Sequence, residues 1–228
     1  MQLRIASFNI HACIGSDGRF DPARIAAVIR EIDADVLALQ EVEHHLINEE
    51  DLLDYLARST GYQAVAGPTL MRETRHYGNA LLTRLPIINS QSRDISVSPY
   101  EPRAVIEAQL AADEKTLTVM ATHLGLWPAE RRMQVRQLLS LLALQTADIT
   151  LLLGDLNEWF LWGRPLRWLH KFFRRSRHIL TFPAYFPLFS LDRIWVTPEH
   201  ALLAQHSHRS QLSRIASDHL PIIAEINV

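Results

Sequence analysis

Hydrophobic residues along the chain occur either in short continuous runs or at a helical repeat. Runs of roughly four to eight apolar residues are typical of buried strands, whereas apolar positions three and four apart indicate amphipathic helices. The runs predict strands over 3–9, 36–40, 79–83, 104–110, 117–122, 149–153, 191–196 and 222–226.

Helical patterns connect some of these strands. Asp21 followed by Pro22 is typical of a helix start, because an acidic cap accepts a free N–H and proline suits the first helical position. The apolar repeat predicts helices over 22–31, over 51–59 and from Pro128 onward. A hairpin turning through 112–114 joins two strands directly. The pattern therefore predicts mixed sheets covered by helices, a layered α/β architecture.

Composition limits the organisation of the chain. With 228 residues, 48% of them hydrophobic, we expect one domain spanning 1–228. A net charge of -2 gives no general attraction to polyanions, so such binding needs a local patch. The single cysteine, Cys13, cannot form an internal disulfide, and the start MQLRIASFN lacks a secretion signal. We expect a cytoplasmic protein that does not cross a bilayer and acts as a monomer.

Several apolar runs stop at a polar residue suited to catalysis or metal binding. These residues are Asn9, Glu41, His123, Asp155 with Asn157, and the pair Asp218 and His219 before the last strand. Residues two apart in an extended segment project to the same side, so Asp155 and Asn157 can address one point in space. Carboxylate and amide oxygens at such a point suit Mg²⁺ or Mn²⁺, and an amide N–H can also donate to a charged oxygen.

Seven short motifs together resemble the endonuclease/exonuclease/phosphatase superfamily, in that superfamily's order and over nearly the whole chain. They are Ser7-Phe-Asn-Ile10, Leu39-Gln-Glu-Val42, Gly78-Asn-Ala-Leu-Leu-Thr-Arg84, Ala121-Thr-His-Leu-Gly125, Gly154-Asp-Leu-Asn-Glu158, Leu191-Asp-Arg-Ile194 and Ser217-Asp-His-Leu-Pro221. The resemblance implies a DNase I-like fold. This is a four-layer α/β sandwich in which two mixed β-sheets pack face to face between flanking helices, with the site at one rim.

The resemblance also implies a metal centre. Glu41 is expected as the principal ligand of Mg²⁺ or Mn²⁺, with Asn9 close by and Asp218 as a further ligand. The reaction it implies is in-line hydrolysis of a phosphate ester. Positioning of the reacting groups and neutralisation of charge on the phosphate would supply most of the rate enhancement.

The expected catalytic residues are His123, Asp155, Asn157, Asp192 and His219. By resemblance, His219 acts at the scissile phosphate as general base or electrostatic partner, and Asp192 orients it. Asp155 positions or deprotonates the attacking water, while Asn157 and His123 stabilise charge on the phosphoryl oxygens. Whether Asp155 or His219 serves as the base stays open.

Four further residues are candidates for binding substrate. Arg103 and Asn79 are expected to contact phosphate or to support the site. Tyr77 either stacks on substrate or packs on its own loop. The superfamily's DNA-repair branch has an acid two positions after its first asparagine, whereas this chain has His11. His11 is a metal neighbour, a phosphate donor or a plain loop residue, and the departure argues against an abasic-site endonuclease.

The segment Trp159 to His178 contains no acidic residue, and its basic residues are interspersed with aromatic residues. It contains Arg164, Arg167, Lys171, Arg174, Arg175 and Arg177 among Trp159, Phe160, Trp162, Trp168, Phe172 and Phe173. Trp168 and Phe172 lie four apart, so one helical face can enter a lipid interface or stack on bases. The alternative is a solvated basic helix whose aromatics pack into the domain. The first interpretation predicts peripheral contact with the inner face of the membrane or with another polyanion.

Our leading hypothesis is a metal-dependent phosphodiesterase that acts on phospholipid or, next in order, on nucleic acid. The first alternative is a phosphomonoester or phosphoinositide phosphatase, which differs in how many groups the site admits on phosphorus. The second is a non-catalytic module that binds a membrane or partner through Trp159 to His178.

Overall fold

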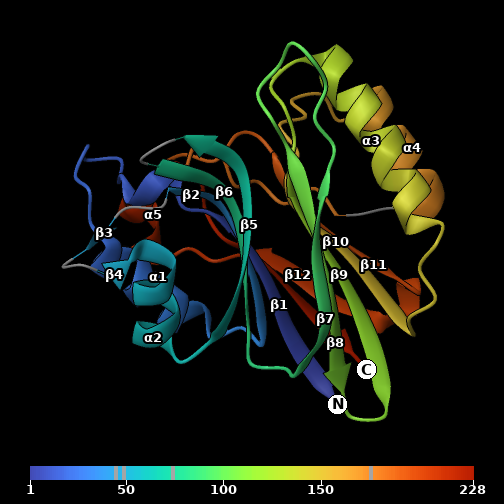
Figure 1. Ribbon diagram of the computed structural model, residues 1–228, viewed down its shortest axis with the longest axis horizontal. Coiled ribbons are helices and arrows are strands. Elements are labelled where there is room, and N and C mark those ends of the chain that lie inside the picture. Colours follow the sequence, from blue (N-terminus) through green and yellow to red (C-terminus); the bar gives the residue numbers. More distant parts are fainter. Residues whose placement is uncertain (44–45, 48–49, 73–74, 175–176) are drawn as a thin grey trace.

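Two mixed β-sheets lie at the centre of the fold, and helices cover the outer face of each (Figure 1). The computed structural model describes residues 1–43, 46–47, 50–72, 75–174 and 177–228. The first sheet has the strand order β12 (Leu202–Ser207), β13 (Ile222–Asn227), β1 (Gln2–Asn9), β2 (Val36–Glu43), β6 (Arg75–Thr83) and β5 (Gln63–Arg72). The second has the order β11 (Asp192–Thr197), β10 (Ile149–Asp155), β9 (Lys115–His123), β8 (Ala104–Ala112) and β7 (Ile87–Asp94).

The helices divide between the two outer faces. Figure 1 shows α1 (Pro22–Ile32) and α2 (Leu52–Thr60) on the side of the first sheet and α3 (Pro128–Leu142) and α4 (Arg164–Phe173) on the side of the second. Among the described residues, the short elements are η1 (His11–Cys13), β3 (Leu46–Ile47), β4 (Glu50–Asp51), η2 (Glu199–Ala201) and α5 (Ser213–Ala216). No helix in the described ranges has the length and apolar character needed to cross a bilayer.

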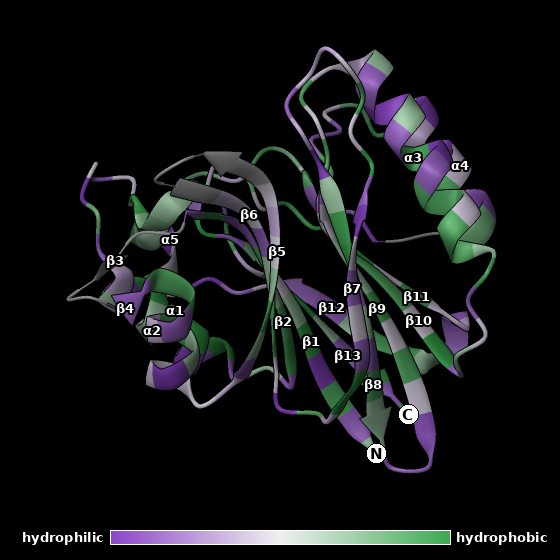
Figure 2. Ribbon diagram, viewed as in Figure 1, coloured by the Kyte–Doolittle hydropathy of each residue, from purple (hydrophilic) through white to green (hydrophobic). Residues whose placement is uncertain are grey.

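Three buried apolar clusters hold these layers together. The first lies between the sheets and includes Ile5 of β1 and Val119 of β9. The second joins the first sheet to α1 and α2, and the third joins the second sheet to α3 and α4. Figure 2 shows hydrophobic residues along the strands in the middle of the molecule. The predicted four-layer sandwich is therefore confirmed.

Strand pairing brings the polar strand ends to one rim. β1 and β2 are parallel, and Asn9 at the end of β1 pairs with Gln40. β9 and β10 are also parallel, and Asp155 at the end of β10 pairs with His123. β11 runs antiparallel to β10, so it begins opposite Asp155 at Asp192. These registers explain how residues far apart in sequence reach the same end of the sandwich.

The strands that the hydrophobic pattern did not predict include three at sheet edges: β5, β7 and β12. An edge strand pairs on one side and exposes much of its surface, so it needs few apolar residues. β7 has the sequence IINSQSRD, in which most side chains are exposed. The predicted start of α1 and the predicted end of α2 agree with the structure, since Asp21 accepts the Arg24 N–H at 2.9 Å and Gly61 ends α2 at a φ of 76°.

Candidate active site

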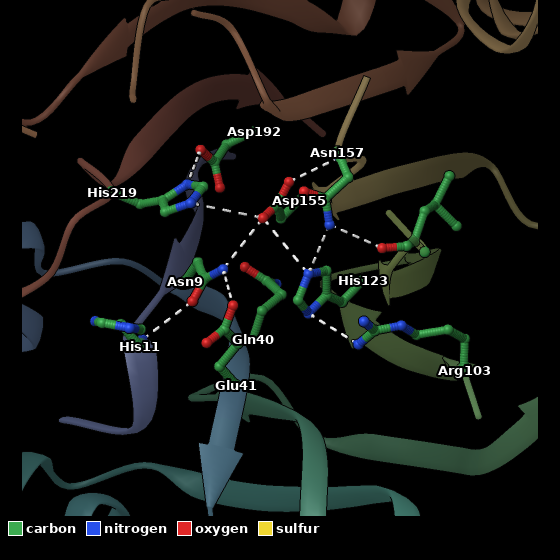
Figure 3. Close-up of polar contacts among 12 residues, drawn as sticks. Asn9, His11, Gln40, Glu41, Arg103, His123, Asp155, Asn157, Asp192 and His219 are labelled. Atoms are coloured by element: carbon green, nitrogen blue, oxygen red, sulfur yellow. Dashed lines mark hydrogen bonds and ion pairs between the residues drawn. The ribbon is translucent and has the colours of Figure 1, made fainter. Parts of the chain in front are cut away.

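Asp155, which is 1% exposed at the end of β10, lies at the centre of a polar network (Figure 3). Its Oδ1 accepts the backbone N–H of Asn157 at 2.8 Å. Its Oδ2 accepts the amide of Asn9 at 3.1 Å and lies 3.6 Å from His123 Nε2 and 3.7 Å from His219 Nε2. One carboxylate therefore connects both sheets and both histidines at the rim.

The backbone around Asp155 explains its position. Gly154 has a φ of 141°, and a Cβ there would lie 1.8 Å from the carbonyl oxygen of Thr122 on β9. Only glycine permits this close approach. Asn157 has a φ of 50°, so it lies in a left-handed turn beyond the strand. The expectation that Asp155 and Asn157 share one extended segment is wrong. Both face His123 because the turn folds Asn157 back.

His219 is held by a second buried carboxylate. Its Nδ1 lies 2.8 Å from Asp192 Oδ2, which also accepts the Thr181 hydroxyl at 2.6 Å. Burial lowers the pKa of His219, but the negative charges of Asp192, Asp155 and Asp218 together with the Asp192 hydrogen bond raise it to about 10. This arrangement favours the imidazolium form at neutral pH.

His123 has the opposite electrostatic environment. Burial first, and then the charges of Arg103 and His219, lower its pKa to about 3, although Asp155 opposes the shift. Its Nδ1 lies 3.4 Å from Arg103 Nη1, and its Nε2 lies 3.0 Å from the amide nitrogen of Asn157. A neutral imidazole has one lone pair, so it can accept only one of these two donors.

Glu41 reaches the site through an irregularity in β2. The register between β2 and β6 shifts between Leu39 and Val42, and Glu41 within this bulge has a φ of 56°. A left-handed conformation is uncommon for glutamate and costs on the order of 1–2 kcal/mol. Asn9 donates to Glu41 Oε1 at 2.8 Å, while its Oδ1 accepts the His11 backbone N–H at 3.0 Å. Asn9 thus presents its NH₂ group, and not its oxygen, to Glu41.

Asp218 lies across the rim on the turn before β13. Its side chain is 40% exposed, and its Oδ1 lies 3.9 Å from His11 Nδ1. The Ser217 hydroxyl donates to the Asn9 carbonyl at 2.7 Å and accepts the His219 backbone N–H at 3.2 Å. This fully buried serine therefore ties the turn of Asp218 and His219 to the end of β1.

Most of these groups surround one cavity of about 280 Å³. Its lining residues are Glu41, Tyr77, Glu101, Arg103, His123, Leu126, Asp155, Asn157, Trp159, Phe182, Leu191, Asp218 and His219. Asn9 and Asp192 contact this lining from behind, and His11 lies beside Asp218. The structure thus brings both carboxylates that were expected to bind the metal and four of the five expected catalytic residues to the cavity wall.

Two expected substrate-binding residues have contacts within the protein. Burial and the Glu41 carboxylate, which accepts a hydrogen bond from the phenol, raise the pKa of Tyr77 well above its usual range. The amide of Asn79 donates to the Ala104 carbonyl at 3.2 Å, and this bond connects β6 to β8 across the sandwich. Asn79 does not line the cavity. Of the two roles expected for it, the contacts favour support over phosphate binding.

Sequence reasoning assigned no role to several residues that support the site. Thr181 holds Asp192, Ser217 holds the turn of His219, and Glu101 lies 3.3 Å from Arg103 Nη2. Ser217 is the first residue of the motif Ser217-Asp-His-Leu-Pro221, so its position beside Asp218 could have identified it as part of the site. Thr181 and Glu101 lie on irregular loops where neither periodicity nor spacing marks them.

The basic and aromatic segment divides into two parts. On α4, Phe173 is 3% exposed and stacks on Trp195 with ring centroids 6.2 Å apart, while Trp168 is half-buried beneath Arg136. For these two rings the contacts favour the alternative in which the aromatics of α4 pack into the domain. Phe172 is 38% exposed, and Arg175 lies outside the described residues. The loop before α4 remains exposed at Phe160, Leu161 and Trp162.

A buried ion pair supports this loop next to Asn157. Arg131 Nε lies 3.3 Å from Glu158 Oε2, and both side chains are almost fully buried. Removing one partner of such a pair leaves an uncompensated buried charge, which costs roughly 3–5 kcal/mol. We expect Arg131→Met to lower the free energy of unfolding by about this amount, measured by urea denaturation.

The double variant Arg131→Met/Glu158→Met serves as the matched control, because it removes both charges. It should recover most of the lost stability. Equal instability of the single and double variants would show that packing, and not charge pairing, is what Arg131 supplies.

Comparison with known proteins adds a family and a fold. The model of the Endonuclease/Exonuclease/phosphatase family matches residues 6–219. The curated Uncharacterized protein YbhP of Escherichia coli K12 is 32% identical over 99% of this chain and 96% of its own length.

Two solved structures share the fold at low sequence identity. TDP2 from D. rerio, complexed with single strand DNA product, has a TM-score of 0.75 and 18% identity, covering 100% of this chain and 99% of its own. The mannosyl-6-phosphatase Bt3783 of Bacteroides thetaiotaomicron has a TM-score of 0.76 and 17% identity, covering 99% of this chain and 100% of its own. Both likenesses extend over the whole sandwich.

Proposed function

The chain belongs to the Endonuclease/Exonuclease/phosphatase family, whose members hydrolyse phosphate esters, and from this premise we propose that it is a divalent-metal-dependent phosphodiesterase. The observation that carries the proposal is the cavity in which Asp155 and His219 face Glu41 and Asp218. Carboxylates to hold a cation and an imidazole to meet a phosphoryl oxygen are what this chemistry requires.

The donor set fits Mg²⁺ or Mn²⁺. These hard cations prefer oxygen ligands, and Mg²⁺ is commonly bound by one or two carboxylates together with water and substrate oxygens. Glu41 and Asp218 both line the cavity, and we propose that they hold the ion. When bound, it would neutralise charge on the phosphoryl oxygens or the leaving group. Because Asn9 turns its NH₂ group to Glu41 and Asp155, we propose that it positions these carboxylates.

A second group of ligand atoms competes for this role. Candidate ligand atoms of Asp155, Asp192 and His219 lie within 4.8 Å of one another, and Asp192 Oδ1 has no partner among the described residues. However, both ring nitrogens of His219 face carboxylates, which favours the protonated ring. An imidazolium has no lone pair for a metal. We therefore assign this cluster to proton chemistry.

We propose that Asp155 orients and deprotonates the attacking water. It is the buried carboxylate between both histidines, so its Oδ2 can accept a proton from a water bound at this point of the cavity. His219, protonated and fixed by Asp192, would donate to a phosphoryl oxygen. The Asn157 NH₂ group already faces His123 and donates to the Leu124 carbonyl at 2.9 Å, so the Arg103 guanidinium is the group that keeps a donor for a second phosphoryl oxygen.

The wall of the cavity supports a diester over a monoester. Its apolar lining consists of Leu126, Trp159, Phe182 and Leu191. A monoester has no second substituent on phosphorus, whereas the second substituent of a diester would meet this apolar wall. We propose phospholipid as the first substrate class. Single-stranded DNA and phosphomonoesters are the alternative substrate classes, because the structural neighbours include TDP2 with a single strand DNA product and a mannosyl-6-phosphatase.

A substrate panel with Mg²⁺ or Mn²⁺ tests the proposal. The panel contains bis(p-nitrophenyl) phosphate, p-nitrophenyl phosphate, a single-stranded oligonucleotide and phospholipid vesicles, with Asp155→Ala as the control for contaminants. We expect diester turnover to exceed monoester turnover by about tenfold or more. Turnover of monoesters alone would instead identify a phosphatase. No metal-dependent turnover would indicate a non-catalytic binding module.

We propose a monomer in the cytoplasm that works at the inner face of the membrane. The one thiol, Cys13, is buried, and burial together with the Asp21 charge raises its pKa to about 12. Little thiolate forms on such a thiol at neutral pH, which is consistent with a structural role for Cys13.

A further inference from the structure

Exposed apolar side chains occur on the loops next to the candidate active site, and one of them, Leu126, lines its cavity. They belong to the loops that follow β9 and β10 and the loop that precedes β11, which are three neighbouring strands. We call them the apolar rim, which consists of Leu126, Trp127, Phe160, Leu161, Trp162, Tyr185, Phe186 and Leu188. Their exposed fractions run from 44% for Leu161 to 81% for Tyr185. Exposure of this many large apolar residues in one region is unusual and marks an interaction surface.

Ring contacts connect the loops of this rim. Trp159 packs against Phe182 and Phe189 with ring centroids 5.7 Å and 4.9 Å apart. Phe160 and Trp162 lie 5.6 Å apart. These contacts fix the loop after β10 against the loop before β11. Packed aromatic rings therefore hold two of the three loops of the apolar rim together.

A basic pocket of about 470 Å³ adjoins the rim. This arginine pocket is lined by Pro128, Arg132, Glu158, Phe160, Trp162, Gly163, Arg164, Pro165 and Arg167. Its three arginines form no ion pair with any residue in the described ranges, whereas Glu158 is neutralised by Arg131. The N-terminal ends of both α3 and α4 also border it. Free guanidinium groups and two helix N-termini together favour a phosphate group.

The arginine pocket and the catalytic cavity share one wall. Asn157 and Trp159 line the cavity, while the alternating residues Glu158 and Phe160 line the pocket. A surface that places a phosphate in the pocket therefore also lies against the cavity mouth. Within the apolar rim, Leu126 lines the cavity, and Phe160 and Trp162 line the pocket.

We propose that the apolar rim and the arginine pocket dock the protein on an anionic phospholipid bilayer, with one lipid phosphate in the pocket. A bilayer interface presents phosphate groups beside an apolar layer, and Trp, Tyr and Phe with adjacent arginines suit it. Single-stranded nucleic acid stacks on flat rings, but the rim also exposes Leu126, Leu161 and Leu188. Docking in this orientation turns the catalytic cavity toward the headgroups. That these headgroups are substrate rests on the proposed function.

Vesicle cosedimentation tests the docking surface separately from catalysis. The protein carries Asp155→Asn throughout, so lipid hydrolysis does not affect the result. Vesicles contain phosphatidylcholine alone or phosphatidylcholine with phosphatidylglycerol. We expect binding to the anionic vesicles, and about a tenfold or greater loss of binding in both Arg164→Gln/Arg167→Gln and Trp162→Ser/Phe186→Ser.

Two control variants change matched residues away from the rim. Arg30→Gln removes an exposed arginine of α1, and Leu144→Ser removes a leucine that is 74% exposed beyond the far end of α3. Both should bind vesicles like the parent, and thermal melting checks the fold of every variant.

Three results would overturn the docking proposal. One is no binding of the folded parent to anionic vesicles. Another is equal binding by parent and rim variants. The third is binding of a single-stranded oligonucleotide or of soluble glycerol phosphate through Arg164 and Arg167 without vesicle binding. Vesicle binding without lipid turnover by the unaltered chain would count against the proposed substrate and leave the docking surface intact.

Discussion

Replacing Asp155 with asparagine is expected to lower kcat for phosphodiester hydrolysis by about a thousandfold while the protein stays folded. The amide keeps an oxygen for the Asn157 N–H, but it removes the charge that faces His123 and His219. It also turns an NH₂ group toward the donor of Asn9. Steady-state kinetics at saturating metal, with thermal melting as the fold check, measure the effect.

Asp148→Asn is the matched control for this substitution. Asp148 is an exposed carboxylate that accepts the Thr116 backbone N–H at 2.8 Å, at the opposite end of β9 from His123. The same chemical change there should leave kcat unchanged. An Asp155→Asn protein with kcat close to that of the parent would remove Asp155 from the mechanism.

Replacing Glu41 with glutamine is expected to raise the concentration of Mg²⁺ or Mn²⁺ needed for half-maximal activity by about a hundredfold. The change keeps the size of the side chain but removes the charge that would hold the cation in the cavity. Chelation by EDTA should abolish activity of the parent, and added metal should restore it. Electron paramagnetic resonance of free Mn²⁺ reports binding independently of turnover.

Glu31→Gln is the control for this second substitution, because Glu31 lies on α1 and contacts His208 at 2.9 Å. It should bind Mn²⁺ like the parent. If Glu41→Gln also bound Mn²⁺ as tightly as the parent, the cation would have to be held elsewhere.

The fold was largely predictable because buried strands and capped helices leave local signals. The run ending at Asp155 is buried throughout, and the paired signal of Asp21 and Pro22 marks the start of α1. Edge strands such as β7 leave no such signal, since they need not be apolar. In the segment Trp159 to His178, the sequence likewise did not show which aromatic side chains are buried. On α4, Leu166, Leu169 and Phe173 form the buried stripe, and Trp168 lies at its margin.

The residues of the site were predictable, but their orientation was not. Strand ends and motifs identified Asn9, Glu41 and Asp155 by residue type. That Asn9 presents its NH₂ group, and that Glu41 lies in a bulge with a positive φ, depends on the packing of distant segments. The left-handed turn at Asn157 is a similar case. Alternation along a strand predicted that Asp155 and Asn157 face the same point, but it is the turn that brings them together.

In the proposed mechanism, Glu41 and Asp218 hold a divalent cation beside the group that Asp155 and His219 act upon. Crystals grown with Mn²⁺ would locate this cation through the anomalous difference map at the cavity. We predict one strong peak between the carboxylates of Glu41 and Asp218. A peak coordinated by Asp155, Asp192 and His219 instead, or a cavity without any peak at saturating Mn²⁺, would contradict the account.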